Sequence, residues 1–119
     1  MLESLGVSYS ERRWISVEEE AMEAVKEGRV KLYRFKPSGR ERWIVVGRHG
    51  DYLVLPYSGY CSCNDFFFRV MSGEKPTCYH LVAVRLAKKS RAYEVIEEDD
   101  EWHDILMNEW LGRKAHEER

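Results

Sequence analysis

The sequence has no long apolar run, no glutamine, and only three prolines and three cysteines in 119 residues. The missing apolar run excludes an ordinary membrane helix, which needs about 20 consecutive apolar residues. The first residues, MLESLGVSYSERRW, lack the cationic stretch and apolar core of a secretory signal peptide. We therefore expect a cytoplasmic protein.

The shortages of cysteine and glutamine lead to two further expectations. Three cysteines are an odd number, which argues against a self-contained disulfide framework. Glutamine is absent while Glu, Lys and Arg are abundant, which is the bias reported for hyperthermophile proteins. This bias suggests a prokaryotic, thermophilic source.

The composition, 44% hydrophobic and 34% charged, is that of one ordinary soluble domain over residues 1–119. Its net charge of −2 conceals three blocks: residues 1–28 carry −4, residues 29–97 carry +7 and residues 98–119 carry −5. A local basic block of this kind is what a nucleic-acid surface requires. The alternative is that these side chains are only the solvent face of a hairpin.

The pattern in the first half predicts one helix followed by a meander. Ser16 and Glu19 fit a capping box, and apolar residues at helical spacing run to Gly28, so we expect a helix over residues 17–27. Three β-rich runs follow at residues 30–35, 42–47 and 51–56, separated by turn residues. They predict an antiparallel β-meander.

The second half predicts mainly helices. Asp65 is expected to cap a short helical segment, and Thr77 a longer helix over residues 78–89. A possible short strand lies at residues 93–96, and an amphipathic helix occupies the acidic C-terminal tail, residues 98–119. The fold class is therefore α+β, with helices flanking the meander.

All three cysteines lie in two short clusters, Cys61-Ser-Cys63 and Cys78-Tyr-His80. Three thiolates and an imidazole form a common closed set of structural zinc ligands. Residues i and i+2 of an extended segment point to the same side, so Cys61 and Cys63 can converge where the strand bends. With Thr77 as cap, Cys78 would be the first and His80 the third residue of the following helix. We expect one structural Zn²⁺ ion at these four residues.

This pattern resembles the SWIM-type zinc finger, in which C-x-C is followed after a variable gap by C-x-H. The resemblance covers residues 42–89 and includes Asp65-Phe66, Pro76 and the helix opening His80-Leu-Val-Ala-Val84. It implies a zinc-clasped ββα element. Tyr79 stands where a basic residue is common in the family, which weakens a phosphate contact at that position.

Other metal chemistries fit the spacing less well. The iron–sulfur clusters held by three cysteines and a histidine place the histidine four residues after its cysteine, whereas the spacing here is two. Zinc deaminases need H-x-E together with P-C-x-x-C, and the P-C-x-x-C motif is absent from the sequence. Since every cysteine is assigned to the metal, none is left as a nucleophile, and we expect no enzyme activity.

Two functional hypotheses follow. The first is nucleic-acid binding, with single-stranded DNA favoured, in which Tyr57, Tyr60 and Tyr79 stack on bases. Its candidate phosphate contacts are the basic residues Arg29, Lys31, Arg34, Lys36, Arg40, Arg42, Arg48, Arg69, Lys75 and Arg85, with Lys88 and Lys89 beside them.

The second hypothesis is a protein-interaction adaptor that uses the stripe on the C-terminal helix. Its candidate contacts are Trp102, Ile105, Leu106 and Trp110. The alternative is that this stripe packs on the protein's own sheet. Small stand-alone proteins of the resembled family imply a role in DNA recombination or repair with a recombinase or recombinase paralogue as partner. A purely protein–protein adaptor of the transcription or chromatin type, with no nucleic-acid contact, remains the alternative.

Overall fold

The computed structural model describes residues 9–47, 50–64, 66–74 and 77–117, with side chains from Val17 to Leu111 within those ranges. The elements, in chain order, are α1 (Tyr9–Lys26), β1 (Val30–Lys36), β2 (Glu41–Val46), β3 (Asp51–Leu55), β4 (Tyr60–Cys61), the π-helix η2 (Phe66–Val70), α2 (Tyr79–Ser90), β5 (Glu94–Asp99), the 3₁₀ turn η3 (Asp100–Trp102) and α3 (His103–Glu117).

The expected α+β class is confirmed, and its centre is one five-stranded sheet in the order β4-β3-β2-β1-β5. The first three strands form the expected antiparallel meander, with Leu32 opposite Trp43 and Ile44 opposite Leu53, and β4 adds a fourth antiparallel strand. β5 is different because it pairs with β1 in parallel, with Val95 beside Leu32. Such a pairing requires a crossover connection, and α2, which lies between β4 and β5 in the chain, provides it.

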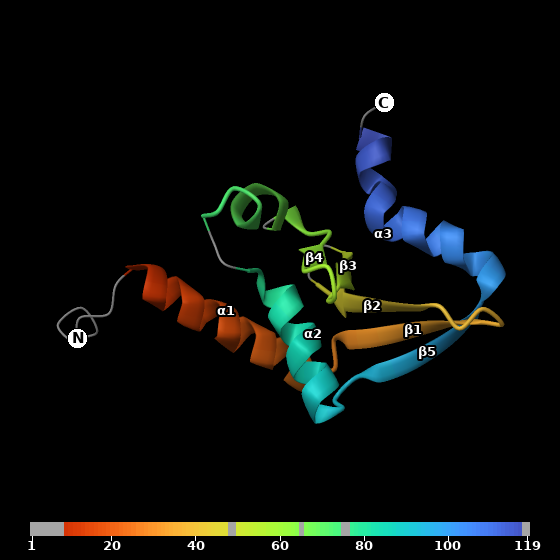
Figure 1. Ribbon diagram of the computed structural model, residues 1–119, viewed down its shortest axis with the longest axis horizontal. Helices are drawn as coiled ribbons and strands as arrows, with labels where there is room; N and C mark the ends of the chain where they lie inside the picture. The colour runs from red at the N-terminus through yellow and green to blue at the C-terminus, as the bar shows by residue number, and fades with distance from the viewer. Residues whose placement is uncertain (1–8, 48–49, 65, 75–76, 118–119) are drawn as a thin grey trace.

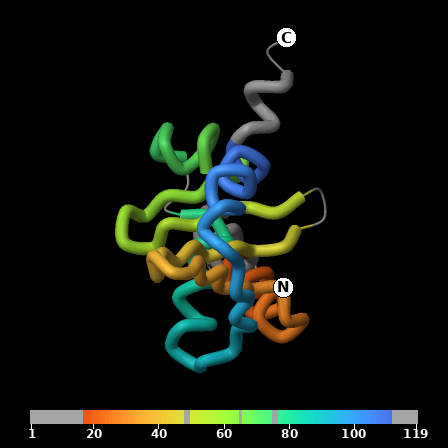
Figure 2. Tube along the Cα trace, turned by 90° about the vertical axis from the view of Figure 1, so that its right-hand side faces the viewer, coloured from red at the N-terminus to blue at the C-terminus, as the bar shows by residue number. Residues whose placement is uncertain are grey.

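Helices cover both faces of the sheet (Figure 1). On one face, α1 and α2 lie side by side over a core that includes Ala24, Leu32, Val45 and Val84. On the other face, which Figure 2 views from the side of α3, Trp110 packs among Phe35, Ile44 and Leu53. The alternation of buried side chains along each strand therefore fills two cores.

The first helix begins earlier than the capping box predicts. Ser16 lies inside α1, which already includes Tyr9, so the predicted start is wrong. The good helix formers Glu11, Arg12 and Arg13 continue the helix upstream of Ser16. The predicted end is confirmed at Gly28, whose φ is 72°. Its N–H donates to Val25 at 3.1 Å, and the N–H of Arg29 donates to Ala24 at 3.0 Å.

The strand predicted at residues 93–96 exists as β5, but it extends to Asp99 and lies at the edge of the sheet. The acidic residues 97–99 explain why a β-propensity pattern misses this extension. Lys31 Nζ lies 2.6 Å from Glu94 Oε1, and Lys36 Nζ lies 2.9 Å from Glu97 Oε1. Ion pairs thus hold the strand to β1, and its sequence lacks the regular alternation of apolar residues that marks most strands.

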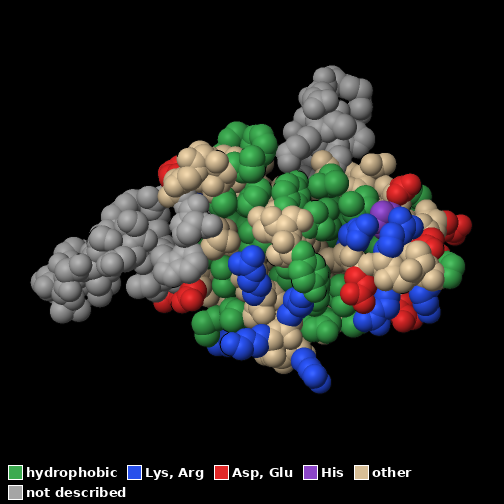
Figure 3. All heavy atoms as spheres, in the orientation of Figure 1, with side chains coloured by type: hydrophobic (Ala, Val, Ile, Leu, Met, Phe, Trp, Pro, Cys, Tyr) green, Lys and Arg blue, Asp and Glu red, His purple; other side chains and the backbone are tan. Residues whose placement is uncertain are grey.

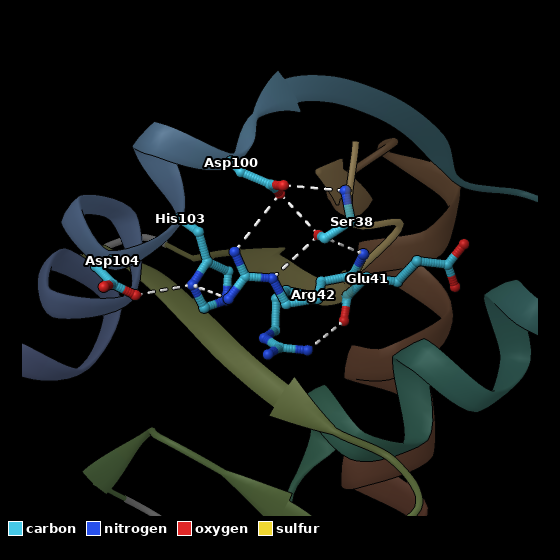
Figure 4. A network of polar contacts seen from close by, with 7 residues as sticks. Ser38, Glu41, Arg42, Asp100, His103 and Asp104 are labelled. Carbon is cyan, nitrogen blue, oxygen red and sulfur yellow. Dashed lines mark hydrogen bonds and ion pairs between the residues drawn. The ribbon is translucent and has the colours of Figure 1, made fainter. Parts of the chain in front are cut away.

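A polar network joins the turn after β1 to the start of α3 (Figure 4). The Asp100 carboxylate accepts the backbone N–H of Ser38 at 2.9 Å and its hydroxyl at 2.7 Å, and Arg40 lies 3.5 Å away. The hydroxyl of Ser38 holds the pKa of Asp100 below its usual value. His103 is buried next to this network, 3.1 Å from Arg40 Nη1, with its ring against Phe35. These contacts direct α3 back over the sheet.

The described part of the chain contains no helix that is both long enough and apolar enough to cross a membrane. The expectations of a cytoplasmic location and of a prokaryotic, thermophilic source stay predictions.

Substitution of the two tryptophans of this region should separate core from surface. Trp110 is 3% exposed and meets the Tyr33 ring edge-on at 5.0 Å, whereas Trp102 is 45% exposed. We expect Trp110→Ala to lower the free energy of unfolding by about 3–5 kcal/mol. Trp102→Ala should change it by less than about 1 kcal/mol. Urea denaturation followed by circular dichroism measures both, and equal losses would contradict the assignment of Trp110 to the core.

Candidate metal centre

The four predicted ligands converge at one end of the sheet. One ligand atom from each of Cys61, Cys63, Cys78 and His80 lies within 4.8 Å of the other three, and all four residues are buried. In a zinc tetrahedron with Zn–S bonds of about 2.3 Å, neighbouring sulfurs are about 3.8 Å apart. A contraction of about 1 Å at most therefore closes the site, and the four residues are positioned to bind one zinc ion.

Ser62 explains how Cys61 and Cys63 reach the same point. Its backbone N–H donates to the carbonyl of Leu53 at 3.0 Å, continuing the ladder of β3 and β4 by one bond. Its hydroxyl accepts the N–H of Leu53 at 3.0 Å, in the place of the backbone carbonyl of a regular ladder. The chain can therefore leave the sheet at Cys63 without an unpaired buried N–H. The predictions from sequence missed this role, although a hydroxyl between two ligands was a signal for it.

Cys63 gains a further backbone contact, because the N–H of Phe66 donates to its Sγ at 3.2 Å. Cys78 and His80 approach from the start of α2, but the register differs from the prediction. Cys78 itself occupies the cap position in extended conformation, so it is not the first residue of the helix and His80 is the second. The Thr77 hydroxyl donates to the Cys78 carbonyl at 3.4 Å, and α2 has no side-chain hydrogen bond at its cap. The expected Asp65 cap lies outside the described residues.

The imidazole of His80 supports the metal assignment independently. It is buried between the rings of Tyr52 and Tyr79, with centroid distances of 4.7 and 4.0 Å, and neither of its nitrogens has a hydrogen-bond partner among the described residues. A buried polar atom without a partner costs free energy. Coordination of a metal by one of the nitrogens removes part of that cost.

The thiols differ in how readily they ionise. Hydrogen bonds from Cys61 and Cys78 lower the pKa of Cys63, and the same bond to Cys63 raises the pKa of Cys61. A hydrogen bond with Cys61 favours the Cys78 thiolate, but the bond with Cys63 and burial outweigh it and raise the Cys78 pKa to about 12. Without a metal, one thiolate is thus favoured at Cys63, and zinc binding displaces the protons of the others.

Five of the ten predicted nucleic-acid residues form ion pairs within the protein. Arg29 pairs with Glu27, Lys31 with Glu94, Arg34 with Glu41, Lys36 with Glu97 and Arg40 with Asp100. Arg42 donates to the carbonyl of Glu41 at 2.9 Å, and its Nε is buried. The dense basic stretch of the sequence is therefore not a free cationic face. Three of these acids follow residue 93, so a local count of charge could not reveal the pairing.

The other predicted basic residues fall into two groups. Arg48 and Lys75 lie outside the described residues, and Arg69 on η2 is exposed but has an interaction partner. Arg85, Lys88 and Lys89 lie on α2, next to the exposed Tyr57. The other two tyrosines, Tyr60 and Tyr79, are half-buried, with Tyr60 against Phe66.

The predicted partner stripe of the C-terminal helix divides into two halves. Trp110 is buried and Leu106 is half-buried against the sheet, so the alternative reading is correct for these two residues. Trp102 and Ile105 remain exposed, at 45% and 55%.

The fold and the ligand set define a zinc-finger protein whose metal ties the end of a β-meander to a helix. Among curated proteins, the chain is 34% identical over 99 residues to the zinc finger SWIM domain-containing protein 7 homolog of Dictyostelium discoideum. The aligned residues are 80% of this chain and 64% of the relative. It is 34% identical over 76 residues to zinc finger SWIM domain-containing protein 7 of Mus musculus, covering 61% of this chain and 50% of the relative. The chain belongs to the SWIM-type zinc finger proteins.

A third relative is an uncharacterized protein of Archaeoglobus fulgidus, 32% identical over 81 residues, which are 66% of this chain and 60% of the relative. The chain thus spans from half to just under two thirds of the length of these relatives. No family model and no solved structure matches it.

Removal of the metal should loosen the protein around the ligands first. We expect one zinc per chain by elemental mass spectrometry, and we expect Cys63→Ser to lose it. Apparent zinc affinities of finger peptides correspond to about 10–16 kcal/mol, which appears as folding free energy. Chelation should therefore speed amide hydrogen exchange most strongly between Cys61 and His80. Unchanged exchange there after verified zinc removal would contradict a structural metal.

Ser62→Ala should destabilise the protein without removing a ligand. It leaves the buried N–H of Leu53 unpaired, at a cost of about 1–3 kcal/mol. The exposed Ser58, whose hydroxyl makes no contact with a described residue, gives the matched control Ser58→Ala. Urea denaturation and zinc content should show reduced stability with full zinc for Ser62→Ala only. Equal stability of the two variants would show that the hydroxyl does not support the bend.

Proposed function

We propose that this SWIM-type protein acts in DNA recombination or repair, joining a recombinase-like protein partner to nucleic acid. The link to recombinases comes from the family resemblance, since the relatives' names mention only the SWIM zinc finger. The buried four-ligand cluster favours a structural rather than a catalytic role for the metal, because a closed tetrahedral site leaves no position for an activated water. In this proposal the protein is not an enzyme.

The observation that carries the partner half is the exposure of Trp102 and Ile105. They lie three residues apart where η3 meets α3, while Trp110 further along α3 anchors the helix to the sheet. Neighbours at this spacing share one face of a helix. Tryptophan is enriched at binding hot spots. A rigid helix that presents one exposed tryptophan and one isoleucine is suited to a pocket on a partner protein.

The test uses the zinc-loaded protein and purified recombinase-type proteins encoded by the same genome. Trp102→Ser combined with Ile105→Ser should weaken their association at least tenfold in a titration, with an unchanged melting temperature. The control is Met22→Ser, which changes a similarly exposed residue, 54%, on α1. Association that survives the double variant would contradict this surface, and the absence of association with any recombinase would contradict the partner class.

The second candidate function is the adaptor with no nucleic-acid contact. The ion pairs within residues 29–42 favour it, because they occupy five of the ten predicted phosphate contacts. Affinity capture from the native host, with and without nuclease, distinguishes the two. Nuclease-resistant partners combined with no binding of any oligonucleotide by the pure protein would select the adaptor.

A further inference from the structure

One basic surface of the protein has no acidic partner among the described residues. It consists of Arg85, Lys88 and Lys89 on α2 and Tyr57 in the turn between β3 and β4, and we name it the α2 surface. None of the three cations forms an ion pair with a described residue, in contrast to those of β1. Figure 3 shows Lys and Arg side chains together in the centre of the face over α2, whereas cations and acids alternate at the β1–β5 end.

The arrangement of the α2 surface follows from helix geometry. Lys88 and Lys89 lie three and four residues after Arg85, so the three side chains share one side of the helix. Together with Pro56 and Tyr57 they line a shallow hollow of about 460 Å³. This volume lies within the range of about 300–1,000 Å³ typical of small-ligand sites. Lys88 and Lys89 also favour the negative end of α2, but Arg85 lies before its last turn, so the helix dipole does not account for all three.

Tyr57 adds a feature that a purely electrostatic surface lacks. Its side chain is 94% exposed, yet it is held in place, because Lys88 Nζ lies 4.7 Å from its ring centroid and 3.4 Å from its hydroxyl. The same ammonium lies 5.9 Å from the Trp43 ring of the sheet. An aromatic ring fixed by a cation and open to solvent is a platform on which an unpaired base can stack.

We infer that the α2 surface binds single-stranded nucleic acid, with phosphates on Arg85, Lys88 and Lys89 and one base on the Tyr57 ring. This inference rests on the nucleic-acid half of the proposed function and gives it a location. It replaces the stretch Arg29 to Arg42, in which every cation except Arg42 is paired with a Glu or Asp carboxylate. A duplex fits the surface less well, because its stacked and paired bases cannot reach Tyr57.

The test compares two variants with the same change of charge. Arg85→Gln with Lys89→Gln removes two cations of the α2 surface, and Arg34→Gln with Lys36→Gln removes two paired cations of β1. The zinc-loaded full chain is titrated against fluorescent 20-nucleotide oligodeoxyuridylate, oligouridylate and a duplex of equal length, from 50 to 300 mM salt. Fluorescence anisotropy gives the dissociation constants, and zinc content and melting temperature verify the fold.

We expect the α2 pair to weaken binding of the single strand at least tenfold and to reduce the slope of log K against log salt by about 1.4, since each phosphate contact contributes about 0.7. The β1 pair should change binding less than threefold. Tyr57→Ala should weaken it about 5- to 150-fold, and Tyr57→Phe should retain it. The duplex should bind more weakly than either single strand. The single strand that binds more tightly shows whether the surface prefers deoxyribose or ribose.

Five outcomes would overturn the inference. Equal losses from the α2 and β1 pairs would show that only overall charge matters, and equal binding of the duplex or full binding by Tyr57→Ala would exclude the stacked base. If the wild-type protein binds an oligonucleotide and none of the α2 variants weakens it, the site is wrong and the proposed function stands. If the wild type binds no oligonucleotide, the nucleic-acid half of the proposed function fails too. The titration with recombinase-type proteins then tests the remaining half, the protein partner.

Discussion

The closure of Cys61 and Cys63 onto Cys78 and His80 is the constraint on which the rest of the structure depends. It joins the last strand of the meander to the start of α2, two elements separated by a loop whose segment η2 has one buried residue, Phe66. α2 then crosses the sheet to β5, and β5 leads to α3, so the position of the second half of the chain follows from this junction. A small core rarely supplies more than about 3–5 kcal/mol of stability, and a zinc contribution of about 10–16 kcal/mol is large beside it.

The parallel strand β5 changes how the charge pattern of the sequence is to be interpreted. In the sequence, a basic block precedes an acidic one, as if the protein had a cationic face and an acidic tail. In the structure, β5 and η3 place Glu94, Glu97 and Asp100 beside the cations of the first hairpin. The same contacts cover one side of β1 and neutralise it. A cation count along the chain is therefore a poor guide to a phosphate-binding surface, and the cations that remain without an acid are the informative ones.

The parts of this fold that were predictable are those set by local chemistry. The metal ligands, the first three strands and the end of α1 at Gly28 each depend on residues close together in sequence, and they were predicted correctly. The parallel pairing of β5 depends on ion pairs across more than 60 residues, and its acidic composition hid it. The split of the α3 stripe was not predictable either, because helical spacing places Trp102 and Trp110 in one pattern. The polar network at Asp100 holds the start of α3, and Trp110 further along is the one that reaches the sheet.

The metal and the α2 surface are connected through the elements they share. Tyr57 lies in the turn that enters β4, the strand that carries Cys61, while Lys88 lies on the helix that begins after Cys78. The cation and the ring meet because these two elements are held together, by the apolar core under α2 and by the metal ligands at its start. Direct contact between a nucleotide and the metal is not needed for such coupling, because the metal fixes the distance between the ring and the cations. A closed and buried metal site can therefore govern binding at an exposed surface through the geometry of one strand and one helix.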